Sequence, residues 1–347
     1  MSENLNRILL LRTDRIGDVV LTTPVVSVLR NRFPNLNITF MARDYTRPLL
    51  EQYPEIDDIF VYEPGGKHKG IRGHWCLSQE LKQRCFDAAI FFYPRPQLAA
   101  AVKLAGIPFR IGNGYKWYST LFNERIFEHR KHGNRHELEH NLSMLQPLVA
   151  EIPSTITYNF QLSDSLLEWQ KTYLRKRNIV GNYIIIHPGS GGSAPNLSLD
   201  QYKTVLQTIL QNYAASSIIF TGVQEETSVI TKIIDGADKR VVNAAGDFNI
   251  EQLMAIIRGA KLLVASSTGP IHIANALGVP VVGFYCPAAP CSPRRWGPYH
   301  QPEWVLMPQE IIPCDHCNPE KCHNGNCLET ISINDLGNFI KKRLREI

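Results

Sequence analysis

The sequence has no apolar run that approaches the ~18 residues needed for a membrane-spanning helix. Its first seven residues, MSENLNR, include an acid and lead directly into a short apolar run, unlike a secretory signal with its longer apolar region. The signatures of an RNA-binding module and of a zinc finger are also missing. We therefore expect a cytoplasmic protein that does not bind nucleic acid.

Common nucleotide-binding fingerprints are missing as well. The most glycine-rich loop, residues 187–196 (HPGSGGSAPN), has neither the GxGxxG spacing of a dinucleotide site nor a following GK[ST]. ATP hydrolysis and NAD chemistry thus lack their usual signatures.

The composition is that of a globular protein, with 44% hydrophobic and 20% charged residues. A chain of 347 residues suits two domains of about 150 residues each. The formal charge of +5 is unevenly spread, since residues 103–135 contain seven cations against only Glu124 and Glu128. This stretch could meet a membrane phospholipid, an acidic glycolipid or nucleic acid, or it could be a solvated face.

Four of the eight cysteines lie close together near the C-terminus. Their spacing is a CxxC followed by two gaps of four residues, which is not the usual pair of CxxC motifs of a zinc site. Two interpretations stay open, a structural metal site or reduced thiols in a compact loop, for Cys314, Cys317, Cys322 and Cys327.

Short apolar runs alternate with amphipathic stretches along the whole chain, which predicts an α/β protein with parallel sheets. The expected strands are residues 8–11, 38–41, 59–62, 88–93, 183–186, 217–220, 241–243, 262–265 and 281–284, and helices are expected at 24–32, 164–177, 199–212, 250–258 and 273–277. We expect one doubly wound domain over residues 1–160 and a second over 161–330. A C-terminal helix within 331–347 is predicted to pack back on the first domain.

Two loops that follow predicted strands are suited to a diphosphate. Residues 267–272 (STGPIH) form a Thr-Gly turn at a helix start, where backbone N–H groups and a hydroxyl are available. In the loop 187–196, three glycines allow close approach of an anion and two serines add hydroxyls. Each loop could equally be a plain strand-to-helix connection.

The first predicted strand is followed by RTDRIGDVVLTTP, residues 12–24. Gly17 permits a tight turn, and Asp18 would stand at the carboxyl edge of the first sheet. Its carboxylate could accept a proton from an attacking hydroxyl, or it could merely cap the following helix.

Four segments together resemble the ADP-heptose:lipopolysaccharide heptosyltransferases of glycosyltransferase family 9: residues 12–24, 187–196, 267–287 and 314–332. The resemblance implies a GT-B fold, in which two Rossmann-like doubly wound domains face a central cleft. It implies ADP-heptose as donor on the second domain and a lipopolysaccharide core/lipid A acceptor on the first. An inverting transfer without metal or other cofactor is implied, with peripheral contact at the cytoplasmic face of the inner membrane.

The resemblance also assigns residues. Asp18 falls on the position of the general base. The donor would be bound by Gly17, Gly189, Ser190, Gly191, Gly192, Ser193, Asn196, Glu225, Phe248, Ser267, Thr268, Gly269 and His272. For the acceptor we expect cationic side chains, namely Arg12, Arg15, Arg43, Lys116 and Arg125.

Two departures from the family pattern leave the donor open. Ser267 stands where an Asp is common, and residues 194–197 (APNL) stand where a Lys often neutralises the diphosphate. The alternatives are a family-9 transferase with another nucleotide sugar and a nucleotide-sugar-binding protein without turnover.

Overall fold

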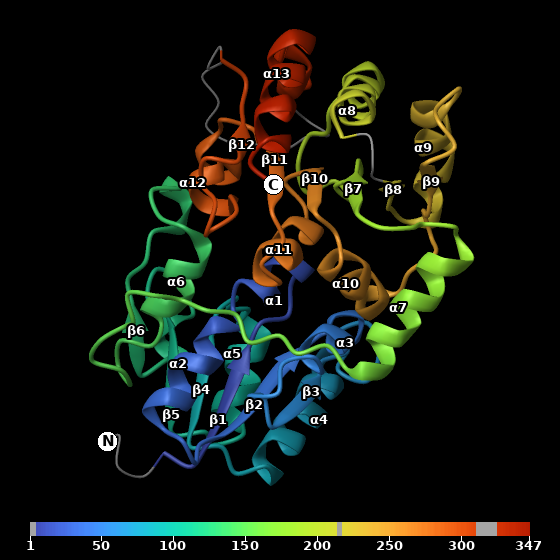
Figure 1. Cartoon of the computed structure of the whole chain (residues 1–347). Coiled ribbons are helices and arrows are strands. Elements are labelled where there is room, and N and C mark those ends of the chain that lie inside the picture. The colour runs from blue at the N-terminus through green and yellow to red at the C-terminus, as the bar shows by residue number, and fades with distance from the viewer. Residues whose placement is uncertain (1–4, 214–216, 310–324) are drawn as a thin grey trace. The chain divides into compact units, whose positions relative to one another are not determined.

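The computed structural model describes residues 5–213, 217–309 and 325–347 (Figure 1). Within it the chain divides into two compact units. Of the described residues, the first unit contains 5–129 and 137–161, and the second contains 130–136 and those from 162 onward. The predicted boundary after residue 160 lies one residue before this division, and the short insertion of 130–136 into the second unit was not foreseen.

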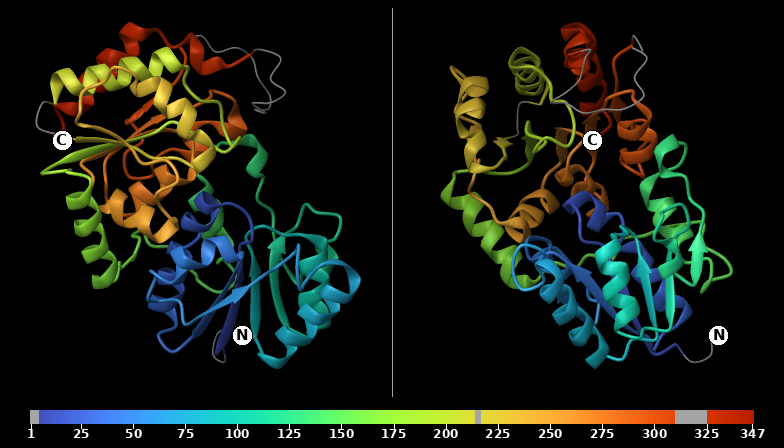
Figure 2. Two further views of the ribbon diagram at one scale, coloured as in Figure 1. Left: turned by 90° about the vertical axis from the view of Figure 1, so that its right-hand side faces the viewer. Right: turned by 180° about the vertical axis from the view of Figure 1, so that it is seen from behind.

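The first unit is built on a parallel six-stranded sheet in the order β3-β2-β1-β4-β5-β6. Its strands are β1 (Arg7–Leu11), β2 (Asn37–Ala42), β3 (Asp58–Val61), β4 (Ala88–Phe91), β5 (Phe109–Asn113) and β6 (Glu124–Ile126). Its helices are α1 (Ile16–Val20), α2 (Pro24–Arg32), α3 (Arg47–Leu50), α4 (Gly70–Gln83), α5 (Pro96–Leu104) and α6 (Glu137–Ser143). The central strands β1 and β4 are apolar and almost wholly buried because helices cover both faces of the sheet (Figure 2).

The second unit repeats this plan with the order β12-β11-β10-β7-β8-β9. Its strands are β7 (Tyr183–His187), β8 (Ser217–Phe220), β9 (Val241–Asn243), β10 (Leu262–Ser266), β11 (Val281–Phe284) and β12 (Val305–Leu306). Its helices are α7 (Asp164–Lys176), α8 (Leu199–Asn212), α9 (Thr227–Ile234), α10 (Ile250–Arg258), α11 (Gly269–Ala276), α12 (Pro293–Trp296) and α13 (Ile333–Leu344). The predicted α/β class with two doubly wound sheets is confirmed.

Both sheets reverse their strand order once, between β1 and β4 and between β7 and β10. In open α/β sheets, ligands bind beyond the carboxyl ends of the strands at this switch point. The loops after β1, β7 and β10 are those that the sequence singled out.

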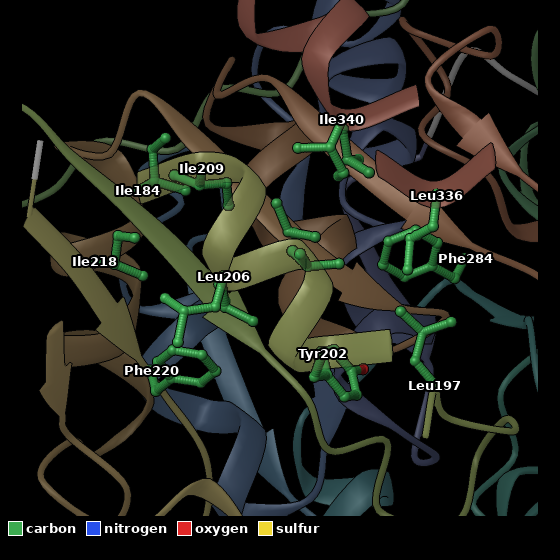
Figure 3. Close-up of a cluster of buried hydrophobic side chains, with 14 of the residues drawn as sticks. Ile184, Leu197, Tyr202, Leu206, Ile209, Ile218, Phe220, Phe284, Leu336 and Ile340 are labelled. Atoms are coloured by element: carbon green, nitrogen blue, oxygen red, sulfur yellow. The ribbon is translucent and has the colours of Figure 1, made fainter. Parts of the chain in front are cut away.

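The C-terminal helix does not follow its prediction. Helix α13 packs along α8, and its side chains Leu336 and Ile340 lie in the buried core of the second unit (Figure 3), as does Leu344. The expectation that it packs on the first domain is therefore wrong. Its apolar face is buried on the amphipathic helix α8 instead, which begins with a complete capping box formed by Ser198 and Gln201.

Candidate functional site

Several candidate residues of the first unit lie at the carboxyl end of β1. Asp18 is the third residue of the short helix α1, whose N-cap residue is Arg15, and no side chain caps that helix end. The alternative that Asp18 serves as the N-cap is therefore wrong. The Asp18 carboxylate instead pairs with the guanidinium of Arg12, and 15% of its side chain remains exposed.

Arg12 is the centre of a buried network, with only 2% of its side chain exposed. Its Nε donates to Asp14 Oδ1 (2.8 Å), and Nη2 donates to Asp18. Both terminal nitrogens donate to Glu137 Oε1 (3.3 Å), and Nη1 also donates to the Phe92 carbonyl at the end of β4 (3.4 Å). Arg12 thus bridges the switch point between β1 and β4 and fixes Asp18 from one side.

Helix α6 supplies two members of this network that sequence reasoning missed. Glu137 and Asn141 lie one turn apart, and Asn141 Oδ1 accepts from Arg12 Nη1 (3.1 Å). The Asn141 amide donates in turn to the Leu21 carbonyl (3.0 Å) and to Thr22 Oγ1 (3.1 Å). The only sequence signal was the i, i+4 spacing of two polar residues on a short helix, 125 residues or more after Arg12.

One cation in this network faces three carboxylates. Burial disfavours the charged form of Arg12, but Asp14, Asp18 and Glu137 together raise its pKa above the ordinary value, so the guanidinium stays charged. Burial raises the pKa of Asp14 to about 6, although the Arg12 charge opposes that rise. The negative charge of Asp18 adds to the rise, and the single Arg12 cation cannot compensate the three neighbouring carboxylates fully.

The predicted acceptor cations have different environments. Arg12 is committed within the protein, so the structure does not give it the direct acceptor contact that was expected. Arg15 and Arg43 are exposed near the carboxyl edge, where the Arg43 guanidinium lies 5.9 Å from the Tyr45 ring centre. Lys116 follows β5 and Arg125 lies on β6, and both are exposed.

In the second unit, the loop after β7 is held by its own hydroxyl groups. Ser190 Oγ donates to the Ala194 carbonyl (2.6 Å). Ser193 Oγ contacts the carbonyls of Ser190 (2.7 Å) and Ser267 (3.1 Å), which ties this loop to the one after β10. The two predicted donor loops are thus adjacent at the switch point, and Gly191 and Gly192 have positive φ of 55° and 71°.

At the start of this loop, His187 Nδ1 lies 2.9 Å from Thr221 Oγ1. Burial lowers the pKa of His187 to about 4, so the ring is neutral near pH 7. At the end of the loop, the Asn196 carbonyl accepts from Asn326 Nδ2 (2.6 Å), while its buried side-chain oxygen has no hydrogen-bond partner among the described residues.

The loop after β10 opens α11. Thr268 is the N-cap residue in an extended conformation, and Gly269 is the first residue of the helix. The N–H groups of a helix start attract an anion. Ser267 N donates to the Phe284 carbonyl (3.1 Å), and the buried ring of His272 lies 6.2 Å from that of Trp296.

An acidic residue near these loops differs from the predicted one. Glu225 is exposed, whereas the carboxylate of Glu226 lies against Gly189 and Gly222. A Cβ atom at Gly189 would be 1.7 Å from Glu226 Oε1, and one at Gly222 would be 2.5 Å from Oε2. Val223 N donates to Glu226 Oε2 (2.9 Å) and holds it there. The acidic residue beside the glycine loop is therefore Glu226 and not the predicted Glu225. The 3-10 turn at Gln224–Glu226, which precedes α9, determines which of the two carboxylates faces the loop.

Phe248 belongs to an aromatic cluster with α7. Its ring centre lies 4.9 Å from that of Tyr173 and 6.1 Å from that of Trp169. The neighbouring Asp247 accepts from the Tyr173 hydroxyl (2.6 Å) and pairs with Arg177. Phe248 is half-buried, so one part of its ring surface is accessible.

Among the described residues, no group of three or more His, Cys, Asp or Glu side chains is arranged to hold a metal ion. Three of the four clustered cysteines, Cys314, Cys317 and Cys322, lie outside the described residues, and Cys327 begins a short 3-10 helix at Cys327–Thr330. None of the described helices has the length and apolarity required to span a bilayer.

Proteins of known family are similar to this chain along most of its length. A Haemophilus influenzae protein provisionally named a glycosyltransferase is 27% identical over 342 residues, which covers 95% of this chain and 94% of that protein. Lipopolysaccharide heptosyltransferase 3 of Escherichia coli is 24% identical over 275 residues, covering 78% and 79% of the two chains.

The fold is that of a solved family 9 glycosyltransferase from Veillonella parvula, with a TM-score of 0.87 at 21% identity, covering 100% of this chain and 99% of that one. The GT-B class expected from the resemblance is thereby confirmed. The sequence profile of glycosyltransferase family 9 (heptosyltransferase) matches residues 74–328. Because this match spans more than half of the chain, the protein belongs to glycosyltransferase family 9 and is a glycosyltransferase.

Proposed function

We propose that the enzyme transfers heptose, with inversion, from ADP-heptose to the inner core of lipopolysaccharide at the cytoplasmic face of the inner membrane. The family description and the E. coli relative both name heptosyl transfer, and they support this substrate class. The observation that carries the proposal is the partly exposed Asp18 carboxylate, held by Arg12 at the carboxyl end of β1.

In this proposal Asp18 is the general base. Its carboxylate takes the proton of the acceptor hydroxyl as that oxygen attacks the anomeric carbon of the donor. The new C–O bond forms while the bond from the anomeric carbon to the phosphate oxygen breaks, and ADP leaves with the bonding electrons. Arg12 keeps Asp18 oriented without itself contacting the substrate.

The second unit would bind the donor. The start of α11 at Thr268 and Gly269, together with the glycine loop 189–192, supplies N–H groups for the diphosphate. We assign Glu226 to the ribose hydroxyls because its carboxylate borders that loop. The half-buried ring of Phe248 offers a surface for the adenine.

The central test is Asp18→Asn, which keeps the size of the side chain and removes the proton acceptor. We expect transfer to fall by about 10²- to 10⁴-fold. ADP affinity and the unfolding temperature should stay near those of the unaltered protein. Near-normal turnover of this variant would refute the role of Asp18.

Donor identity needs its own experiment, because Ser267 departs from the usual Asp. Transfer should be measured with ADP-heptose and with UDP- and GDP-sugars under the same conditions. If the enzyme preferred another nucleotide sugar, its assignment as a transferase would hold, but heptose would not be the donor sugar. Binding of ADP-heptose without any product would favour a non-catalytic binding protein.

Transfer should not depend on a metal ion, since N–H groups and a helix start are proposed to stabilise the leaving diphosphate. The rate in EDTA should therefore equal the rate in its absence. Loss of activity that Mg²⁺ restores would contradict this mechanism. Loss that only Zn²⁺ restores would instead indicate a structural site at the clustered cysteines.

A further inference from the structure

Three large exposed rings lie in the segments that follow the two outermost strands of the first sheet, β5 and β6. Trp117 is 84% exposed, Phe127 is 60% exposed and Tyr115 is 50% exposed. Tyr115 and Trp117 lie in the turn after β5, and Phe127 directly follows β6, which is the edge strand of the sheet. We call these three residues the aromatic edge. Neighbouring exposed aromatic side chains mark a surface that contacts another molecule or a membrane.

The fold holds the aromatic edge outward. Gly114 N donates to the Ile126 carbonyl (3.0 Å), which joins the two segments at their ends. The ring centres of Tyr115 and Phe127 are 5.3 Å apart, and the ring of His129 stacks on Tyr115 at 3.7 Å. A Cβ at Gly114 would lie 2.5 Å from the Phe127 ring, so the ring packs directly over this glycine.

Positive charge accompanies these rings. Lys116 lies between Tyr115 and Trp117 in the chain, and Arg125 lies two residues before Phe127; both cations are exposed. Of the two acids in this region, Glu128 is engaged by His140 Nδ1 at 2.7 Å. Cationic side chains beside amphipathic rings complement an anionic lipid surface, where the rings enter the headgroup layer and the cations meet phosphates.

We propose that the aromatic edge inserts into the headgroup region of an anionic bilayer while Lys116 and Arg125 bind lipid phosphates. This reassigns both cations from the acceptor sugar to the membrane. The proposal rests on the proposed function in one respect, since a membrane glycolipid acceptor gives the enzyme a reason to dock. Its binding step, however, can be measured without any donor or acceptor.

The test is cosedimentation of the full chain with vesicles of phosphatidylcholine alone or mixed with phosphatidylglycerol. We expect binding to the anionic vesicles only, and weakening as salt is raised. Trp117→Ala should weaken binding by at least about tenfold, as should the double change Lys116→Ala/Arg125→Ala. Trp117→Phe should retain most of the binding but lose part of the blue shift of tryptophan fluorescence.

Val180→Ala is the matched control, because Val180 is 82% exposed but lies in the second unit. It should bind vesicles like the unaltered chain. Equal binding by Trp117→Ala and the unaltered chain would overturn the proposal, as would equal binding to neutral and anionic vesicles. A fall in oligomer size on Trp117→Ala in lipid-free sedimentation would also overturn it, in favour of a second copy of the chain.

The proposed function can fail separately. Trp117→Ala should leave transfer to a water-soluble, delipidated acceptor unchanged and slow transfer to an acceptor embedded in vesicles. One outcome is that the unaltered enzyme transfers no heptose to either acceptor and still binds vesicles as expected. That result would refute the proposed substrate and leave the proposed membrane-binding role of the aromatic edge supported.

Discussion

At the scale of single residues, the network around Arg12 determines how Asp18 is presented. Arg12 and Asp18 belong to one short segment, and its sequence was sufficient to place Asp18 at the carboxyl end of β1. The partners of Arg12 were not predictable in the same way, because Glu137 and Asn141 come from a distant helix. Without them an arginine beside a predicted base looks available for an anionic acceptor, which explains the error.

The raised pKa of Asp14 should make the stability of the protein depend on pH, and this dependence can be measured. The Asp14 pKa is about 6 in the folded protein against an ordinary 3.8, so the folded state holds the proton more tightly than the unfolded chain. The stabilisation from this group is therefore complete below about pH 4 and is lost as the pH rises through about 6. Asp14→Asn removes the titration and keeps an acceptor for Arg12 Nε.

The free energy of unfolding of Asp14→Asn, relative to the unaltered protein, should therefore increase between pH 4 and pH 7. The expected gain is on the order of 1 kcal/mol or more, since one pKa unit corresponds to about 1.4 kcal/mol. Urea denaturation at several pH values measures it. A difference that does not change with pH would mean that Asp14 titrates alike in the folded and unfolded states.

At the scale of secondary-structure elements, periodicity located the long and strongly apolar segments well. The bounds of α2, α8 and α10 are those expected, because each has clear end signals such as Pro24 or the capping boxes of Ser198 and Asn249. Strands β5, β6 and β12 were missed. Residues 109–113 (FRIGN) and 124–126 (ERI) mix charge with apolar residues, and β12 has only two residues, so their pairing comes from neighbouring strands.

The loop after β7 leads to a prediction about Gly189. In Gly189→Ala the new methyl group would collide with the Glu226 carboxylate and displace it from the glycine loop. If Glu226 binds the donor ribose, ADP affinity measured by calorimetry should fall about 10- to 100-fold, as expected for loss of a charged hydrogen bond. Glu226→Gln should weaken ADP binding in the same direction.

A glycine in open space provides the control for that experiment. A Cβ at Gly65 meets nothing within 4 Å, so Gly65→Ala should bind ADP normally. Normal ADP affinity in Gly189→Ala would show that the carboxylate can shift without consequence, and the ribose assignment would be withdrawn.

At the scale of the whole molecule, the described residues include one cluster of buried hydrophobic side chains in each unit. One core joins the central strands of the first sheet to α4 and α5, and the other joins β7, β8 and β10 to α8 and α13. The alternation of strands and helices in the sequence predicted two α/β domains. It could not show which of the two domains the C-terminal helix packs on. An amphipathic helix needs only an apolar partner surface, and both units offer helices on their sheets.

A destabilising substitution in one core should therefore lower the stability mainly of the unit that contains that core. Ile340 is fully buried on α13, so Ile340→Ala should destabilise the second unit by about 2–5 kcal/mol. Leu98→Ala is the matched change in the first core, where Leu98 is also fully buried. Amide hydrogen exchange should rise across residues 162–347 in the first variant and across residues 5–129 in the second, because local stability follows the packing of each core. Saturating ADP should restore protection in Ile340→Ala but not in Leu98→Ala, since a ligand stabilises the state that binds it. If either substitution raised exchange evenly along the chain, the two units would unfold as one, and α13 would have to be regarded as a support for the entire molecule.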